Sequence, residues 1–86
     1  MIKTGIGYDV HKLALNSKLI LGGVEIPSEF GSVGHSNGDV LIHAIVDSIL
    51  GASSMGDIGQ LFSSSDDKWK NAESMIFLKL TIEKVQ

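Results

Sequence analysis

The stretch DVLIHAIVDSILGA, residues 39–52, decides the fold of this chain. Val40 to Leu50 is mostly apolar and predicts a helix that is buried on most sides, capped at its start by a polar residue. One polar stripe interrupts the apolar surface, because Asp39, His43 and Asp47 are each four residues apart and stack on one face. His43 is therefore either a metal ligand or a buried histidine hydrogen-bonded to Asp39 or Asp47.

Upstream, the stretch IGYDVHK at residues 6–12 places an aspartate and a histidine two residues apart. Thr4 to His11 predicts a strand, on which Asp9 and His11 share one face, opposite Ile6, Tyr8 and Val10. If the polar stripe of the helix packs beside the end of this strand, Asp9, His11 and His43 converge. Two imidazoles and one carboxylate leave one coordination position open, as in catalytic zinc sites.

The remaining segments predict an α+β fold with a mixed β-sheet, helices packed on one face and a β-hairpin near the N-terminus. In KLILGGVEIP, residues 18–27, two β-favouring runs flank Gly22-Gly23, which suit a tight turn with positive φ at both central residues. Residues 28–39 form a glycine-punctuated loop, in which Asn37 or Asp39 can cap the following helix. A second helix is expected from near Asn71 to the end, with an apolar stripe of Ala72, Met75, Ile76, Leu78 and Ile82.

Composition narrows the classes of function. The 86 residues carry a formal net charge of −3 and no cysteine, so any metal must be held by histidine and carboxylate. The lack of a basic tract argues against a nucleic-acid partner. No apolar run reaches the roughly 20 residues of a membrane-spanning helix. We expect a single domain over residues 1–86, located in the cytoplasm, or in a plastid if a transit peptide has been removed.

Two glycine-bearing segments are candidates for ligand contact. In GHSNGD, residues 34–39, a glycine-rich loop runs directly into a helix N-terminus, which is a natural anion site, and His35 and Ser36 would add donors. The alternative is an ordinary turn followed by an N-cap. In MGDIGQLF, residues 55–62, Asp57 lies between two glycines, as a turn aspartate or as a ligand for hydroxyls or a cation.

Taken together, four stretches resemble one family, the 2-C-methyl-D-erythritol 2,4-cyclodiphosphate synthases of the non-mevalonate isoprenoid pathway. The combined patterns D-V-H and H-S-x-G-D-x-x-x-H are specific, and the stretches follow in the family's order and spacing. They are GYDVHK (7–12), LILGGVEIP (19–27), GHSNGDVLIHAIVDSILGA (34–52) and GDIGQLF (56–62).

The resemblance implies roles for particular residues. Asp9, His11 and His43 are expected to bind a catalytic zinc ion, and His35 to help stabilise the transition state as the catalytic residue. Asp57 and Gly59 are expected to contact the erythritol part of the substrate. The full substrate-binding set implied in this way is Asp9, Val10, His11, His35, Ser36, Asp57, Ile58, Gly59, Phe62, Ser63, Ser64, Ser65 and Asp66.

The resemblance also implies a reaction, cofactors and partners. The substrate would be a small nucleotide diphosphate, 4-diphosphocytidyl-2-C-methyl-D-erythritol 2-phosphate, whose 2-phosphate attacks the β-phosphate and releases CMP. Such a phosphoryl transfer mainly needs positioning and charge neutralisation, which zinc supplies as a Lewis acid. Magnesium or manganese would bridge the diphosphate. The family forms homotrimers with sites between subunits.

The sequence departs from the family in two places. The loop FSSSDD has Ser63 and Ser64 where the family has proline and a first aspartate, although Asp66 remains, and Asn37 stands where aspartate is usual. Family chains also continue well beyond residue 86, into further strands, the cytidine pocket and a second threonine that stabilises the transition state. We therefore expect unpaired edges and exposed apolar surface, and little or no activity of this polypeptide alone.

Two other functions compete with the cyclase. Two histidines and a carboxylate also describe the facial triad of non-haem iron oxygenases, but this chain has too few strands for the β-barrel-like folds that carry it. The other competitor is an inactive metal-binding fragment, or a truncated paralogue that lacks the nucleotide-binding half.

Overall fold

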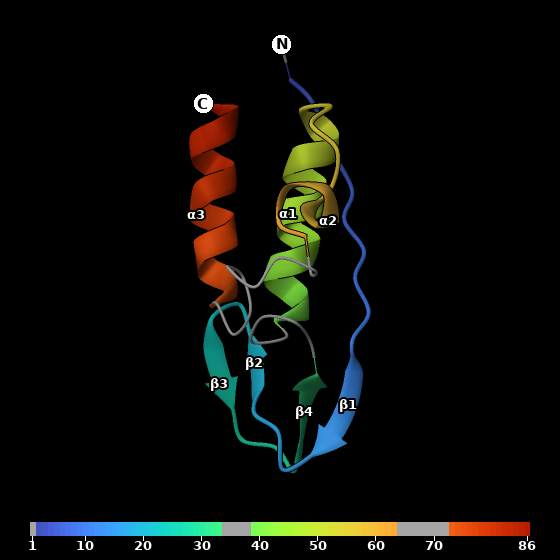
Figure 1. Ribbon diagram of the computed structural model, residues 1–86, viewed down its shortest axis with the longest axis vertical. Coiled ribbons are helices and arrows are strands. Elements are labelled where there is room, and N and C mark those ends of the chain that lie inside the picture. The colour runs from blue at the N-terminus through green and yellow to red at the C-terminus, as the bar shows by residue number, and fades with distance from the viewer. Residues whose placement is uncertain (1, 34–38, 64–72) are drawn as a thin grey trace.

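The computed structural model describes residues 2–33, 39–63 and 73–86. Figure 1 shows the strands gathered at one end of an elongated molecule and the long helices side by side at the other, where both termini lie. Its principal extents are 44 × 26 × 17 Å. The elements in chain order are β1 (Lys12–Leu15), β2 (Leu19–Leu21), β3 (Val24–Ile26), β4 (Phe30–Val33), α1 (Val40–Ala52), α2 (Ile58–Leu61) and α3 (Ser74–Val85).

The α+β class and the hairpin near the N-terminus are confirmed, but the sheet differs from the one expected. In place of one mixed sheet, the described strands form two antiparallel pairs, β1 with β4 and β2 with β3. The helices extend from the end of these pairs and do not cover one sheet face (Figure 1). The glycine turn explains the antiparallel pairing of β2 with β3, because strands joined by a short turn can pair only in that sense. Strand β4 lies within the segment that was predicted to be a loop, and its partner β1 begins at Lys12, directly after the predicted N-terminal strand.

The turn between β2 and β3 follows the prediction from its glycine pair. Gly22 has a φ of 63° and Gly23 a φ of 82°, which side chains with a Cβ rarely adopt. Leu21 therefore pairs directly with Val24 across a two-residue turn. Both turn residues also donate their N–H groups to one carboxylate, that of Asp39, at 3.0 and 2.7 Å.

Helix α1 begins where the sequence predicted, with Asp39 as its N-cap. The Asp39 carboxylate accepts a hydrogen bond from the N–H of Ile42 at 3.1 Å and is fully buried. Since the same carboxylate accepts both turn N–H groups of the hairpin, a single side chain joins the hairpin to the start of the helix. A buried carboxylate is tolerated here because several N–H donors satisfy it.

The core lies between α1, α2 and α3. Its buried apolar residues are Ile42, Val46, Leu50, Phe62 and Phe77. The rings of Phe62 and Phe77 stack with their centroids 4.9 Å apart, which joins the end of α2 to α3. None of the helices in the described part of the chain has both the length and the apolar character to cross a membrane.

The prediction for the inward face of α3 was wrong. Met75, Ile76 and Ile82, which were expected to form the apolar stripe, are exposed, whereas Ser74, Phe77 and Thr81 are buried against α1. Leu78 is half-buried, and Ala72 lies outside the described residues. Residues 74, 77 and 81 share one helical face, and two of the three have small hydroxyl side chains that allow close packing around the phenylalanine ring.

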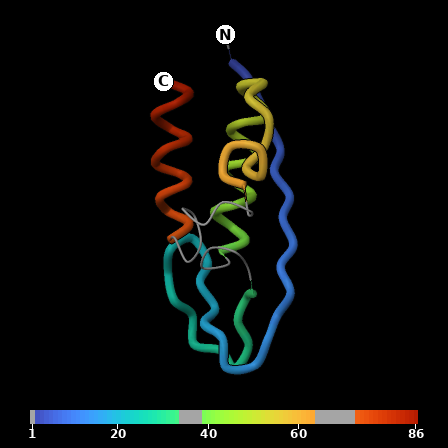
Figure 2. The backbone as a smooth tube through the Cα atoms, in the orientation of Figure 1, coloured from blue at the N-terminus to red at the C-terminus, as the bar shows by residue number. Residues whose placement is uncertain are grey.

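The prediction of a strand over Thr4 to His11 was also wrong. This segment is extended but belongs to no sheet, and it runs alongside α1 (Figure 2). A Cβ added at Gly5 would collide with the carbonyl oxygen of Ser48, and one at Gly7 with that of Ala44. The segment lacks strand pairing because one of its faces lies directly on the helix backbone and no described strand runs beside it.

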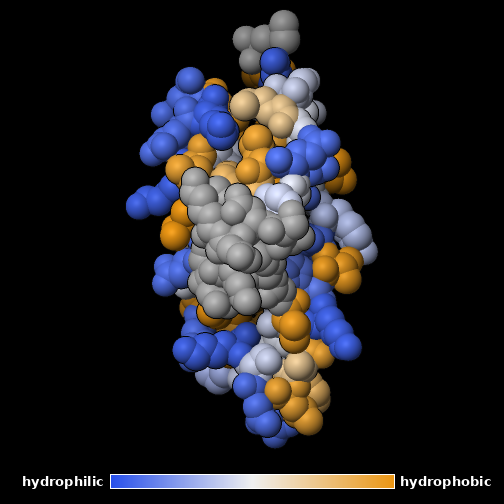
Figure 3. All heavy atoms as spheres, viewed as in Figure 1, coloured by the Kyte–Doolittle hydropathy of each residue, from blue (hydrophilic) through white to orange (hydrophobic). Residues whose placement is uncertain are grey.

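The predicted alternation along this segment nevertheless holds. Ile6, Tyr8 and Val10 are 90%, 81% and 67% exposed, whereas Asp9 and His11 are partly buried. Apolar side chains also reach the surface elsewhere, as the space-filling view shows (Figure 3). The exposed apolar surface expected for this chain is therefore present, and part of it forms the outward face of residues 2–10.

We expect the Gly7→Ala substitution to destabilise the chain by about 1–3 kcal/mol, because the added methyl group must push the segment away from the backbone of α1. Urea unfolding followed by circular dichroism measures this change. Gly51→Ala is the matched control, since nothing lies within 4 Å of its Cβ position and alanine favours a helix by up to about 1 kcal/mol. Equal midpoints for Gly7→Ala and the unmodified chain would contradict the close approach.

Candidate metal centre

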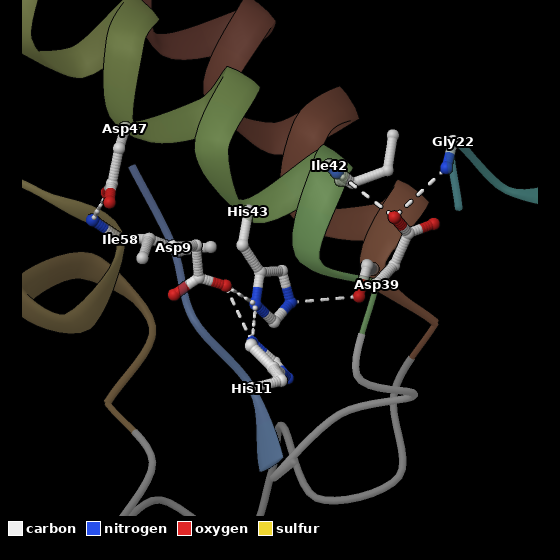
Figure 4. A network of polar contacts seen from close by, with 9 residues as sticks. Asp9, His11, Gly22, Asp39, Ile42, His43, Asp47 and Ile58 are labelled. Atoms are coloured by element: carbon white, nitrogen blue, oxygen red, sulfur yellow. Dashed lines mark hydrogen bonds and ion pairs between the residues drawn. The ribbon is translucent and has the colours of Figure 1, made fainter. Parts of the chain in front are cut away.

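Three side chains from two elements meet at one point. Asp9 and His11 come from the extended N-terminal segment and His43 from α1, and they face one another as Figure 4 shows. One ligand atom from each residue lies within 4.8 Å of the other two. The atoms are Oδ2 of Asp9, Nε2 of His11 and Nδ1 of His43. The convergence predicted from the sequence is thus confirmed.

The spacing of these atoms suits a metal ion. In a tetrahedral zinc site with Zn–N bonds of about 2.0–2.1 Å, neighbouring ligand atoms lie about 3.3 Å apart. His43 Nδ1 lies 3.2 Å from both Asp9 Oδ2 and His11 Nε2. Asp9 Oδ2 and His11 Nε2 are 2.6 Å apart, as in a direct hydrogen bond, and would separate by about 0.7 Å around an ion. The three residues therefore fit a metal with one position open.

The glycines of the N-terminal segment explain why the cluster forms. Gly5, Gly7, Asp9 and His11 alternate with exposed residues, so all four face α1. The two glycines bring the backbone against the helix near Ala44 and Ser48. The segment then passes His43 close enough for the next two inward side chains to reach its ring.

His43 is held on its other side by α3. Its Nε2 lies 2.9 Å from the hydroxyl oxygen of Ser74, and its ring centroid lies 6.0 Å from that of Phe77. When Nε2 carries the proton and donates to Ser74, Nδ1 presents its lone pair to the cluster, as a metal ligand must. The second ring nitrogen of His11, Nδ1, is buried and has no hydrogen-bond partner in the described residues.

Burial lowers the pKa of His43 below its ordinary value of 6.5, because the protonated ring loses hydration. The Asp9 carboxylate opposes this shift by favouring the charged form, and His11 adds to it. The net effect keeps His43 neutral to a lower pH than a solvent-exposed histidine. A neutral imidazole is the form that binds metal.

The other two members of the polar stripe connect α1 to its neighbours. Asp39 holds the hairpin turn, as described above. Asp47, one helical turn after His43, accepts a hydrogen bond from the N–H of Ile58 at 2.7 Å and so anchors the start of α2. The alternative partners proposed for His43, Asp39 and Asp47, thus bind other elements. His43 contacts Asp9 and His11 (Figure 4), and its other ring nitrogen contacts Ser74.

The anchoring of α2 places a second set of predicted residues near the cluster. Asp57 precedes Ile58 and caps α2 by accepting from the N–H of Gln60 at 2.9 Å, and it remains exposed. Gly59 is exposed as well. Both residues are next to Ile58 in sequence, and Ile58 is fixed to Asp47, one turn of α1 after His43. The free carboxylate oxygen of Asp57 can accept from a ligand hydroxyl.

The remaining predicted site residues have different surroundings. The side chain of Val10 is exposed on the face opposite Asp9 and His11, so a contact from Val10 would have to come from its main chain. The Phe62 ring is part of the core, and Ser63 is half-buried. His35, Ser36, Ser64, Ser65 and Asp66 lie outside the described residues.

Sequence reasoning missed Ser74. It stands on the inward face of α3, where the sequence predicted apolar residues, and it is fully buried beside His43. The available signal was the spacing of Ser74, Phe77 and Thr81, which puts two hydroxyl groups on one helical face with an aromatic ring. A serine at a buried helical position needs a polar partner.

Comparison with known proteins gives the same assignment as the motifs. The chain is 60% identical over 78 residues to a 2-C-methyl-D-erythritol 2,4-cyclodiphosphate synthase of Clostridium novyi (strain NT), which covers 91% of this chain and 50% of that protein. The structure resembles the bifunctional IspDF from Campylobacter jejuni with a TM-score of 0.91 and 49% identity, covering 99% of this chain and 23% of that one. It also resembles IspF of Plasmodium falciparum in a CDP complex, with a TM-score of 0.72, 40% identity and coverage of 96% and 51%.

These similarities extend over nearly all of the chain but only part of each relative. The chain spans about half the length of the curated synthases it matches. The YgbB family matches residues 2–86, which include all three members of the metal cluster. The resemblance drawn from the motifs is confirmed, and the chain belongs to the YgbB family.

Proposed function

We propose that this chain supplies the metal-binding and diol-binding half of a 2-C-methyl-D-erythritol 2,4-cyclodiphosphate synthase, within a single domain over residues 1–86. The observation that carries the proposal is the convergence of Asp9, His11 and His43 in a chain of this family. Two imidazoles and one carboxylate with an open position are the donors of a catalytic metal site. We assign zinc as the metal, since nitrogen-rich tetrahedral sites suit it.

The proposed reaction is an intramolecular phosphoryl transfer. The 2-phosphate of the substrate forms a new P–O bond to the β-phosphorus of the diphosphate, the bond to the cytidylate breaks, and CMP leaves with its electron pair. When bound, zinc would polarise a phosphate oxygen and orient it for attack. The chain's own residues supply positioning, which dominates the catalysis of phosphoryl transfer.

Each predicted contact has a place in this proposal. Asp57 would accept a hydroxyl of the erythritol, and Gly59 would let the substrate approach the backbone of α2 without hindrance. His35 and Ser36 would contact phosphate next to the cluster, with His35 stabilising the transition state. Magnesium or manganese would neutralise the diphosphate. The other substrate contacts proposed are the main chain of Val10, Ile58, and the segment Phe62, Ser63, Ser64, Ser65 and Asp66.

The nucleotide site would lie in sequence that the relatives have beyond the matched half. One related structure is a CDP complex, and its matched region is about half of that chain. We propose that the complete site lies between subunits of a homotrimer in the cytoplasm or a plastid. The competing proposal is a metal-binding fragment or truncated paralogue without turnover, which shares the cluster.

The His43→Ala substitution should abolish stoichiometric zinc binding, because two remaining ligands cannot hold the ion against water. Metal content after dialysis, measured by plasma emission spectroscopy, tests this. Ser17→Ala, in the turn between β1 and β2, is the control and should keep one zinc per chain. Iron in place of zinc, recovered from anaerobically purified protein, would favour the non-haem iron alternative.

Zinc affinity should fall as the pH is lowered, because both histidine ligands must be deprotonated to bind. The lowered pKa of His43 means that its ring resists protonation longer than an ordinary histidine, so its contribution to the fall comes at the more acidic end. Once both rings are protonated, affinity should fall by about tenfold per pH unit for each histidine. Chelator competition between pH 8 and 4 measures this, and an unchanged affinity at pH 4 would exclude both histidines as ligands.

The isolated 86-residue polypeptide should turn over the cytidine diphosphate substrate at well below about 1 per second, the low end of ordinary enzymes. This follows from the proposal that the nucleotide site lies in sequence that the relatives have beyond the matched half. CMP release followed by chromatography measures the rate. The full-length Clostridium novyi synthase is the positive control. Turnover by the isolated chain at the rate of that control would refute the assignment of this chain as half of a site.

A further inference from the structure

Ser74 lies in an unusual place for a serine. It is the first residue of α3 and is fully buried, on the helical face that packs against α1. Its hydroxyl oxygen lies 2.9 Å from Nε2 of His43, whereas the other ring nitrogen, Nδ1, faces Asp9 and His11. The His43 ring therefore has polar contacts at both nitrogens: Nδ1 contacts the cluster, and Nε2 contacts α3.

The two nitrogens of His43 cannot both carry a proton in the neutral ring. If Nδ1 carries it, the N–H points at Asp9 Oδ2 and blocks the ligand position. If Nε2 carries it, the N–H donates to Ser74 and the Nδ1 lone pair faces the cluster. An acceptor at Nε2 therefore favours the tautomer that can bind metal.

We propose that Ser74 is a positioning residue for the metal site: its hydroxyl accepts the Nε2–H of His43 and holds that ring in the metal-binding tautomer and orientation. The inference rests on the proposed function, since it assigns His43 as a metal ligand. The role assigned to Ser74 requires no contact with substrate or metal. Ser74 acts only through His43.

The packing of α3 in the core supports this role. Phe77, one turn after Ser74 on the same face, stacks on Phe62 and lies beside the His43 ring. The hydroxyl is thus fixed relative to His43 by the core itself.

The chain also provides a matched control on the same helical face. Thr81 is fully buried like Ser74, but its hydroxyl has no hydrogen-bond partner in the described residues. Thr81→Val removes a buried hydroxyl from the α1–α3 interface without changing its shape. It therefore reports the effect of losing such a group where no histidine is involved.

The experiment measures Zn²⁺ affinity by chelator competition, and the tautomer of His43 by ¹⁵N-histidine correlation spectra with and without Zn²⁺. Ser74→Ala should lower Zn²⁺ affinity by about 10- to 100-fold, as loss of a partner of a metal-bound histidine typically does. In the metal-free protein, the same variant should shift His43 away from the Nε2–H form. Ser74→Thr, which keeps the hydroxyl, should stay close to the unmodified chain, and Thr81→Val should match it in both readouts.

Several results would overturn the proposal. One is Ser74→Ala with unchanged Zn²⁺ affinity and an unchanged His43 tautomer; another is an equal loss of affinity in Thr81→Val. If Ser74→Ala does not fold, the unmodified metal-free chain provides the test, because a His43 that carries its proton on Nδ1 there contradicts the role. Failure of the unmodified chain to bind Zn²⁺ would instead count against the proposed function, while the metal-free tautomer still tests Ser74.

Discussion

The close contact between the N-terminal segment and helix α1 is the constraint on which the site depends. Gly5 and Gly7 place backbone directly on backbone, at carbonyls of α1 that leave no room for a Cβ. The period of two along an extended chain then turns the next two inward residues, Asp9 and His11, toward His43. A cluster of three polar groups is thus assembled by two residues that have no side chains at all.

Helix α1 organises the rest of the molecule through one polar stripe. Asp39 holds the hairpin turn, His43 joins the cluster, and Asp47 anchors α2. Each of these residues is separated from the next by about one turn, so three neighbouring elements are attached at successive levels along the helix. The adjacent apolar face, formed by Ile42, Val46 and Leu50, carries the core residues that pack against α3. One helix therefore fixes both the stability of the fold and the relative placement of the candidate site residues.

The cluster carries a physical cost that is consistent with a role in binding metal. Two imidazole nitrogens and a carboxylate oxygen meet within hydrogen-bonding distance at a partly buried position, and the burial disfavours the protonated ring of His43. A divalent ion would replace the shared protons and satisfy all three groups together. The hydroxyl group of Ser74 in α3 contacts the other ring nitrogen of His43. The outward face of the N-terminal segment, in contrast, leaves Ile6, Tyr8 and Val10 exposed in a chain that spans half the length of its relatives.

Local rules in the sequence were sufficient to predict part of this structure. The glycine pair required a two-residue turn, Asp39 and the apolar run required a capped helix, and the two-residue spacing required Asp9 and His11 to share a face. These features depend on interactions within a few residues of the chain, which the sequence by itself determines. The convergence of these two residues with His43 was predicted only on the condition that the helix packs beside the segment, and the resemblance to the family was what favoured it.

Only the tertiary structure decided how these elements meet. It placed the segment from Thr4 to His11 on a helix and not within a sheet, and it turned Ser74, Phe77 and Thr81 of α3 inward in place of the more apolar stripe. It also placed the Asp39 carboxylate where it accepts hydrogen bonds from the hairpin turn, in addition to capping α1. The reason is that the face an element buries, and the partner a buried polar group finds, depend on the shape of whatever packs against it, which lies far away in the sequence.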